Sequence, residues 1–140
     1  MVQAKQVFET VLYANNLEEA TAFYTDGFGL KLINKTELFV VFEIQPDTSY
    51  LLVFDPAKSI VAGRDVPGHG ATGEGHIAFL ADDEELPAWR KRLALAAIEI
   101  EQEVRWDDGS GGTSIYVRDP AGNSVELAPK SLWSRMSRAD

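Results

Sequence analysis

Cysteine is absent from this chain of 140 residues, and no long hydrophobic run occurs in it. Without cysteine the chain forms no disulfide, and no thiolate is available as a nucleophile or a metal ligand. No apolar run approaches the roughly 20 residues that cross a bilayer. Nothing at the N-terminus resembles a signal peptide. We therefore expect a cytoplasmic protein with no membrane partner.

Basic residues are also scarce, since 13 Lys and Arg stand against 22 Asp and Glu, for a formal net charge of −9. This balance argues against nucleic acid or an anionic membrane as a partner. The chain is 45% hydrophobic and 10% aromatic, which is enough for a packed core. Its length suits one domain, or two small modules that share one core.

The first half of the chain predicts the order β-α-β-β-β. Alternating residues over 7–14 predict a strand, with Val7, Glu9, Val11 and Tyr13 on one face. Asn15-Asn16, followed by Glu19, predicts a capped helix over about 16–27. Three further strands are expected over 30–35, 39–44 and 50–54.

A glycine- and proline-rich stretch over about 56–74 reads as a linker. Its G-x-G-x-x-G, Gly68 to Gly73, precedes a strand rather than opening a helix, so we reject a dinucleotide site. The order β-α-β-β-β then recurs, with strands expected over 76–81, 98–106, 113–118 and 124–128 and a helix over about 84–97. The tail, 130–140, is expected to hold a short helix with Trp133.

The last two strands flank Asp119-Pro120-Ala121-Gly122-Asn123, whose residue types are typical of a tight turn. Beyond the turn, Glu126 lies between Val125 and Leu127 and therefore points to the opposite face. A carboxylate buried there needs a partner. Alternatively the strand lies at a sheet edge and Glu126 is in water, and the strand alone leaves both interpretations open.

The two halves repeat one design. Aligning Glu9 with His76, an offset of 67 residues, places a polar residue at the same strand position in both halves. In these strands and in that of Glu126, the opposite face is the apolar one that a helix would cover. All three polar side chains are therefore expected on a common concave surface if the sheets curl.

Three segments carry a family resemblance: E-T-V-L-Y-A-N-N-L-E-E-A-T-A-F-Y-T-D-G-F-G-L, G-H-I-A-F-L-A-D-D and Y-V-R-D-P-A-G-N-S-V-E-L. With them the chain resembles the vicinal-oxygen-chelate superfamily, which includes glyoxalase I, bleomycin-resistance proteins and extradiol dioxygenases. The resemblance implies an α+β fold in which paired βαβββ modules form a U-shaped mixed sheet around a central cavity. It implies one domain, 1–140, with modules over about 5–55 and 75–129.

The resemblance also implies one divalent metal ion, Fe, Mn, Ni, Co or Zn, held by Glu9, His76 and Glu126. Many metal-binding members have His or Gln where Glu9 stands. Glyoxalase I typically has a glutamate where Leu52 stands, so a fourth protein ligand is missing here. Three ligands leave open positions, as in the two-His-one-carboxylate sites of non-haem iron enzymes. Glu126 or Glu9 is the expected general base.

Four further residues are candidates for substrate binding, each with a structural alternative. His69, in the glycine-rich loop, could act as an acid, a base or a substrate contact, or lie in solvent. Tyr116 and Arg118 share a strand face with Ser114. Arg118 could bind a carboxylate or enediolate, or pair with Asp119 or a glutamate at the sheet edge. Trp106, with Phe54, could form an apolar pocket wall or pack in the core.

Two functions remain open at this point. The first is a metal-dependent lyase, isomerase or dioxygenase acting on a small substrate with adjacent oxygens. The second is a metal-free binding or sequestering protein of the bleomycin-resistance type. Family resemblance and the exposed edges of four-stranded modules also predict a homodimer.

Overall fold

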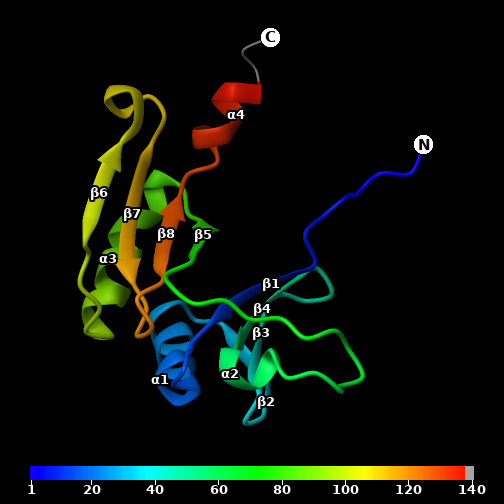
Figure 1. Cartoon of the computed structure of the whole chain (residues 1–140). Coiled ribbons are helices and arrows are strands. Elements are labelled where there is room, and N and C mark those ends of the chain that lie inside the picture. The colour runs from blue at the N-terminus through cyan, green and yellow to red at the C-terminus, as the bar shows by residue number, and fades with distance from the viewer. Residues whose placement is uncertain (138–140) are drawn as a thin grey trace. The chain divides into compact units, whose positions relative to one another are not determined.

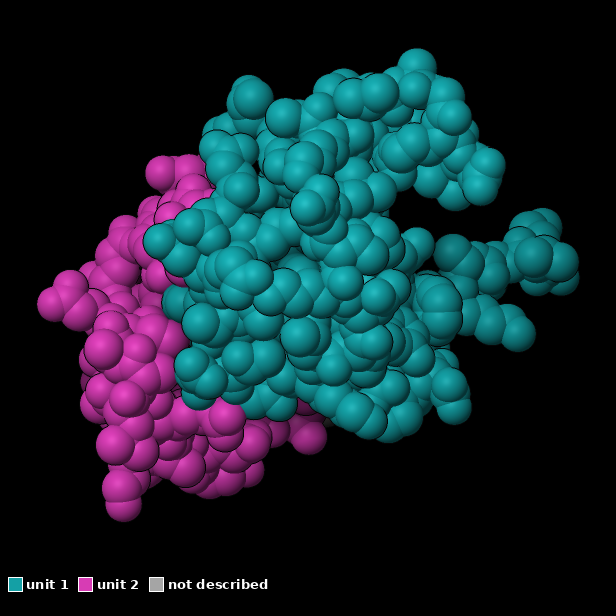
Figure 2. Space-filling view, turned by 90° about the horizontal axis from the view of Figure 1, so that it is seen from below, with its two compact units in different colours: residues 1–73 teal, residues 74–140 magenta. Residues whose placement is uncertain are grey.

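The structure is a computed structural model that describes residues 1–137, and the chain divides into two compact units, residues 1–73 and 74–140 (Figure 2). Each unit is an α+β module with the order βαβββ, as the sequence predicts. Unit 1 contains β1 (Glu9–Tyr13), α1 (Leu17–Ala22), the π-helical turn η1 (Phe23–Gly27), β2 (Lys31–Lys35), β3 (Phe39–Gln45), β4 (Ser49–Phe54) and α2 (Pro56–Ser59). Unit 2 contains β5 (His76–Leu80), the 3-10 turn η2 (Asp83–Glu85), α3 (Leu86–Leu95), β6 (Gln102–Arg105), the 3-10 turn η3 (Trp106–Gly109), β7 (Thr113–Arg118), β8 (Ser124–Ala128) and α4 (Ser131–Ser137).

The two sheets have the same topology, which confirms the internal repeat. Their strand orders are β1-β4-β3-β2 and β5-β8-β7-β6. The first strand of each unit pairs in parallel with the last, and the other pairs are antiparallel, so each sheet is mixed. Glu9 and His76 are the first residues of the corresponding edge strands β1 and β5.

One face of the unit 1 sheet is covered by α1 and η1 (Figure 1). The helix begins where the Asn16 side chain accepts a hydrogen bond from the Glu19 amide at 3.0 Å, as expected for an N-cap. The ring of Tyr24 in η1 lies 5.6 Å from that of Phe42, and both side chains are fully buried. The sheet contributes further buried residues on this face: Leu12, Val40, Leu51 and Val53. These contacts form the core of unit 1.

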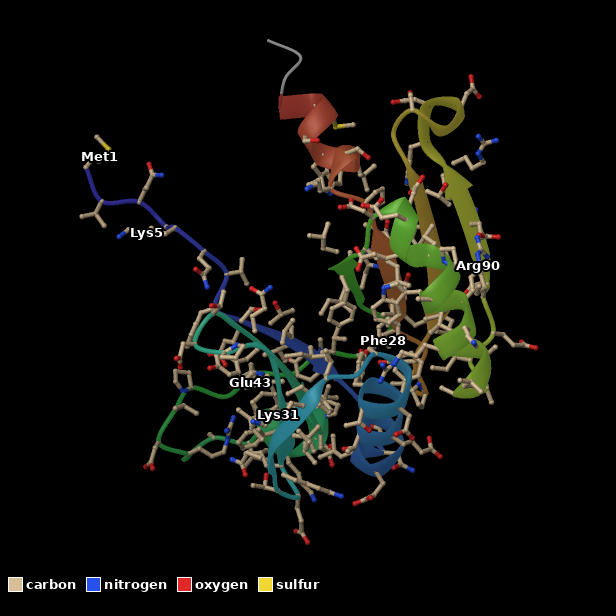
Figure 3. All side chains as sticks on the ribbon, turned by 180° about the vertical axis from the view of Figure 1, so that it is seen from behind. Met1, Lys5, Phe28, Lys31, Glu43 and Arg90 are labelled. Carbon is tan, nitrogen blue, oxygen red and sulfur yellow. The ribbon has the colours of Figure 1, made fainter. Side chains whose placement is uncertain are left out.

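The opposite face carries no helix, and we name it the helix-free face of unit 1. Its residues follow from the strand register: Glu9, Val11 and Tyr13 on β1, Tyr50, Leu52 and Phe54 on β4, and Phe39, Val41 and Glu43 on β3. Lys31 on β2 continues the row, opposite Glu43 (Figure 3). Most of these residues are half-buried, so the face is a mixed polar and apolar surface.

In unit 2, α3 lies along one face of the sheet (Figure 1) and buries Leu86 and Leu93. The strands contribute four buried residues to this core: Ile115, Val117, Val125 and Leu127. Arg90 of α3 (Figure 3) forms an ion pair with Glu103 of β6. The remaining face, the helix-free face of unit 2, holds His76, Ala78, Tyr116, Arg118, Ser124 and Glu126.

Several predicted boundaries differ from the structure, most clearly around β6 and α2. The strand expected over 98–106 is wrong in its extent, because β6 covers only Gln102–Arg105. Ala97 has a φ of 57° and the Ile98 amide donates to the Leu93 carbonyl at 2.9 Å, so the chain is still leaving α3 there. Trp106 falls in η3 instead of the strand. The stretch read as a linker begins with the short helix α2, for which the side chain of Asp55 is the N-cap.

The turn between β7 and β8 is closed by Asp119, as its residue types predict. The buried carboxylate accepts from the amides of Ala121 and Asn123 at 3.0 and 2.9 Å, and from Asn123 Nδ2 at 2.9 Å. Asn123 Oδ1 in turn accepts from the Gly75 amide at 2.8 Å. The turn therefore fixes the start of β5 beside the start of β8.

The tail forms α4, which is held to unit 2 by Leu132, only 5% exposed, and by a 3.0 Å bond from Ser131 Oγ to the Gly111 carbonyl. Trp133 is 66% exposed. Residues 138–140 of the predicted tail lie outside the described part of the chain. Within residues 1–137, every helix is too short or too polar to span a bilayer.

Candidate metal centre

Glu126 lies in the middle of β8, and β8 lies between β5 and β7. The alternative of an exposed edge strand is therefore wrong, and the side chain is buried, with 5% of the residue exposed. Sequence alternation could not separate the two cases, because the position of a strand in a sheet depends on distant partners. A buried carboxylate requires compensation by a hydrogen bond or a cation.

His76 supplies part of that compensation. Its Nε2 lies 3.2 Å from Glu126 Oε1, and its Nδ1 lies 3.1 Å from both the carbonyl and the Oγ of Ser124. A carbonyl oxygen accepts only, so the natural role of Nδ1 is that of donor. With the proton on Nδ1, Nε2 presents its lone pair to a carboxylate oxygen, and a proton or a metal ion is needed between the two atoms. In the other tautomer, Nδ1 accepts from Ser124 Oγ and Nε2 donates to Glu126.

The second carboxylate oxygen is unsatisfied. Glu126 Oε2 is buried and forms no hydrogen bond to any described residue. Buried polar atoms in native proteins nearly always have a partner, and an unpaired one calls for an explanation such as an ion. Oε2 is therefore available to coordinate a cation.

The distance between His76 Nε2 and Glu126 Oε1 is also compatible with two ligands of one metal ion. Ligand nitrogen and oxygen atoms lie about 2.1 Å from ions such as Zn²⁺, so two adjacent ligands on one ion are about 3 Å apart. The observed distance of 3.2 Å between His76 Nε2 and Glu126 Oε1 is compatible with this spacing and also with a hydrogen bond between the two side chains. The bond from His76 Nδ1 to Ser124 resembles the outer hydrogen bond that orients most metal-binding imidazoles.

Tyr116 lies beside Glu126 as its register partner on β7, and its ring stacks on that of His76 at 6.3 Å. Burial, and then the neighbouring carboxylate of Glu126, raise the pKa of Tyr116. A tyrosine with its ordinary pKa of about 10 is already protonated at neutral pH, so the phenol can donate a hydrogen bond. Trp106 is half-buried, and its Nε1 donates to Ser114 Oγ at 2.8 Å. The structure thus places Tyr116 against Glu126, and anchors Trp106 to the Ser114 end of the same strand.

Arg118 is engaged in a different way. Its guanidinium bonds Glu101 at 2.6 Å and Glu74 at 3.0 Å, and it also donates to the Gly122 carbonyl. The alternative of a pair with a glutamate is thus observed. The bond from Arg118 lowers the pKa of Glu101, and all three side chains are exposed. The guanidinium has a structural role in this arrangement.

Glu9 belongs to unit 1, where it is exposed at the start of β1. Over residues 1–137, neither unit by itself gathers three His, Asp or Glu side chains in an arrangement that could hold a metal. The structure brings together His76 and Glu126, both of unit 2, and the participation of Glu9 stays a prediction. Leu52 occupies, in β4, the position that Glu126 occupies in β8, since Val11 pairs with Leu52 and Ala78 with Glu126.

His69 lies on the helix-free face of unit 1. Its Nδ1 is 2.7 Å from the hydroxyl of Tyr13, and its ring meets that of Phe54 edge-on at 4.6 Å. The His69 side chain is half-buried, so the alternative of a loop histidine in solvent is wrong. Sequence reasoning missed Tyr13 as a partner. The available signal was its place on the same strand face as Glu9.

Comparison with known proteins identifies the family of the chain. Residues 6–127 match the family described as the Glyoxalase/Bleomycin resistance protein/Dioxygenase superfamily. A crystal structure of lactoylglutathione lyase from Agrobacterium tumefaciens is 42% identical, with a TM-score of 0.84 over 93% of this chain and 97% of that one. A mutant of the fosfomycin resistance protein FosX from Listeria monocytogenes, complexed with Mn(II) and 1S,2S-dihydroxypropylphosphonic acid, is 22% identical with a TM-score of 0.68 over the whole of both chains, and this shows the fold.

Two curated relatives extend the comparison. Catechol-2,3-dioxygenase of Bacillus subtilis is 30% identical over 131 residues, which cover 89% of this chain and 42% of the dioxygenase. The chain thus matches less than half of that relative's length. Metallothiol transferase FosB of Bacillus licheniformis is 27% identical over 122 residues, 87% of this chain and 73% of the transferase. With the profile match and the repeated βαβββ fold, the chain belongs to the Glyoxalase/Bleomycin resistance protein/Dioxygenase superfamily.

Proposed function

We propose that the protein is a divalent-metal-dependent enzyme that acts on a small substrate with adjacent oxygen atoms, by lyase, isomerase or dioxygenase chemistry. The observation that carries the proposal is the buried carboxylate of Glu126, with Oε1 facing His76 Nε2 and Oε2 without a partner among the described residues. Glu9 is the proposed third ligand. The names of the relatives, which include a lyase, a dioxygenase and a metallothiol transferase, support the general class.

The bound metal would supply Lewis-acid polarisation of the substrate oxygens. The chain's own groups supply proton handling. Glu126 and Glu9 are the proposed bases, since a carboxylate that swings away from the metal could accept a proton from the substrate. Tyr116, whose phenol is neutral at pH 7, can donate a hydrogen bond to a substrate oxygen beside Glu126. Trp106, whose Nε1 donates to Ser114, is the proposed apolar wall of the substrate pocket.

Leu52 restricts the proposal. An aliphatic side chain at the position equivalent to Glu126 offers no fourth oxygen, so at most three protein ligands come from this set. Open positions on the ion would remain for a chelating substrate. A homodimer is part of the proposal and is supported by the edge strands β1 and β5.

Added metal should stabilise the native protein against heat. A ligand that binds only the folded state at 100 times its Kd adds about 2.7 kcal/mol to the free energy of unfolding. We therefore expect the melting temperature of chelator-treated protein to rise by several degrees with micromolar Mn²⁺, Co²⁺, Ni²⁺ or Zn²⁺, followed by calorimetry. A melting temperature unchanged by all of these ions would favour the metal-free binding protein.

A further inference from the structure

Tyr13 and His69 form a pair that the proposed metal chemistry does not use. The two residues are 56 positions apart in sequence, yet the Tyr13 hydroxyl and His69 Nδ1 are 2.7 Å apart. Both side chains are half-buried on the helix-free face of unit 1. Within residues 1–73, the other ring nitrogen, Nε2, has no hydrogen-bond partner. The pair thus presents one unengaged nitrogen.

The loop that carries His69 is held firmly. The His69 amide donates to the Ser59 carbonyl at 3.0 Å, and Ser59 Oγ donates to the His69 carbonyl at 2.6 Å. Ser59 is completely buried. Arg64 donates to the same Ser59 carbonyl at 2.7 Å, which adds a positive charge next to this main-chain bridge. These two bonds fix the main chain of His69 against the buried Ser59. The contact with Tyr13 then fixes the position of the ring.

The Tyr13 bond favours one position of the proton on the His69 ring. A phenol is a good donor and a neutral imidazole nitrogen is a good acceptor, so the favoured arrangement is Tyr13 O–H to Nδ1. The proton of the neutral ring is then on Nε2. His69 presents an N–H donor, and Tyr13 positions it.

The surroundings of the donor are apolar. Phe54 meets the His69 ring at 4.6 Å and stacks on Phe39 at 5.1 Å. Between Tyr13 and Glu9 on the same face lies a half-buried aliphatic strip made of Val11, Leu52 and Val41. Four residues of strand span about 13 Å, so Glu9 and the His69 donor lie at opposite ends of this strip.

We propose that His69 Nε2 binds a carboxylate oxygen at the far end of an elongated substrate whose apolar body lies on the strip of Val11, Leu52 and Val41. The substrate class is then a small carboxylic acid with its reacting oxygens at one end and its carboxylate at the other. That the reacting end lies toward Glu9 rests on the proposed function. The His69 subsite itself does not depend on metal.

A matched pair of probes tests the subsite without metal. 4-Phenylbutanoate offers a phenyl ring and a carboxylate acceptor, whereas 4-phenylbutylamine has the same length and a donor in place of the acceptor. A hydrogen bond to a charged group should make the full-length wild type bind the carboxylate at least about 10-fold more tightly. The net charge of −9 would otherwise favour the amine. Affinities are measured by NMR titration in chelator, at about pH 8, where an ordinary imidazole is neutral.

Variants assign the effect to His69. His69→Phe keeps a ring against Phe54 and removes the donor, so the preference for the carboxylate should disappear. His69→Gln retains an N–H donor and should keep part of the preference. Tyr13→Phe removes only the hydroxyl, and should reduce the preference while ¹⁵N spectra show the proton shared between the two His69 nitrogens.

Three results would overturn the subsite: no carboxylate preference in the wild type, the same preference in His69→Phe, or ¹⁵N spectra of the wild type with the proton on Nδ1. None of these measurements involves a metal. A failed metal-binding experiment with intact carboxylate preference would therefore reject the proposed function and leave the subsite standing. Intact metal binding without a carboxylate preference would reject the subsite alone.

Discussion

Replacing His76 by alanine should abolish stoichiometric metal binding and leave the fold intact. The side chain is 49% exposed and lies on the helix-free face of unit 2, so its loss removes little packing from the core. Loss of a ligand should weaken binding by more than about 100-fold, the upper range for loss of an outer-shell partner. Isothermal titration calorimetry with Co²⁺ measures the affinity, and far-ultraviolet circular dichroism checks the fold.

The matched control is His69→Ala, the same change at the other histidine of the chain, which should keep the metal stoichiometry. Glu9→Gln should weaken binding less than Glu126→Ala, because an amide oxygen can still coordinate. Without metal, Glu126→Ala should be about as stable as the wild type, since the change removes a buried oxygen that has no described partner. A markedly less stable Glu126→Ala protein, with no metal-dependent shift in either protein, would show that His76 and Glu126 are a structural polar pair.

Replacing Phe42 by alanine should have the largest effect on stability. The side chain is fully buried and packs against Tyr24, with ring centroids 5.6 Å apart. Truncation of a buried phenylalanine costs about 3–5 kcal/mol. That is a large share of the roughly 5–15 kcal/mol by which domains are stable. Urea denaturation should show the midpoint shifting strongly downward.

Leu95→Ala is the control for this change, because Leu95 is 84% exposed at the end of α3. Its cost should stay within about 0.5 kcal/mol, as for other surface substitutions. If Phe42→Ala cost no more than the Leu95 variant, the contact of η1 with β3 would not be part of the core.

The sequence predicted those features that depend on local periodicity. Alternation placed Glu126 opposite Val125 and Leu127, and the strand pairing keeps that arrangement. The turn chemistry of Asp119 was also readable, because a side chain that accepts from amides two and four residues later acts locally. The repeat then assigned Glu9 and His76 to equivalent strands.

Features that depend on distant partners were not readable. The pairing of Arg118 with Glu101 and Glu74 involves residues 17 and 44 positions away, and no local pattern selects them over a substrate. The turn that follows α3 uses a positive φ at Ala97, a conformation that favours glycine, so the sequence carried no signal for it. The bond between Tyr13 and His69 required the loop to fold back on β1.

The metal content of protein purified without chelators tests the central claim most directly. One Fe, Mn, Co, Ni or Zn ion per chain, measured by plasma mass spectrometry and absent from the His76→Ala protein prepared in parallel, is the result we predict. Wild-type protein with less than about a tenth of an ion per chain, and no uptake when these ions are added in excess, would contradict the metal centre. It would leave a metal-free binding protein as the function.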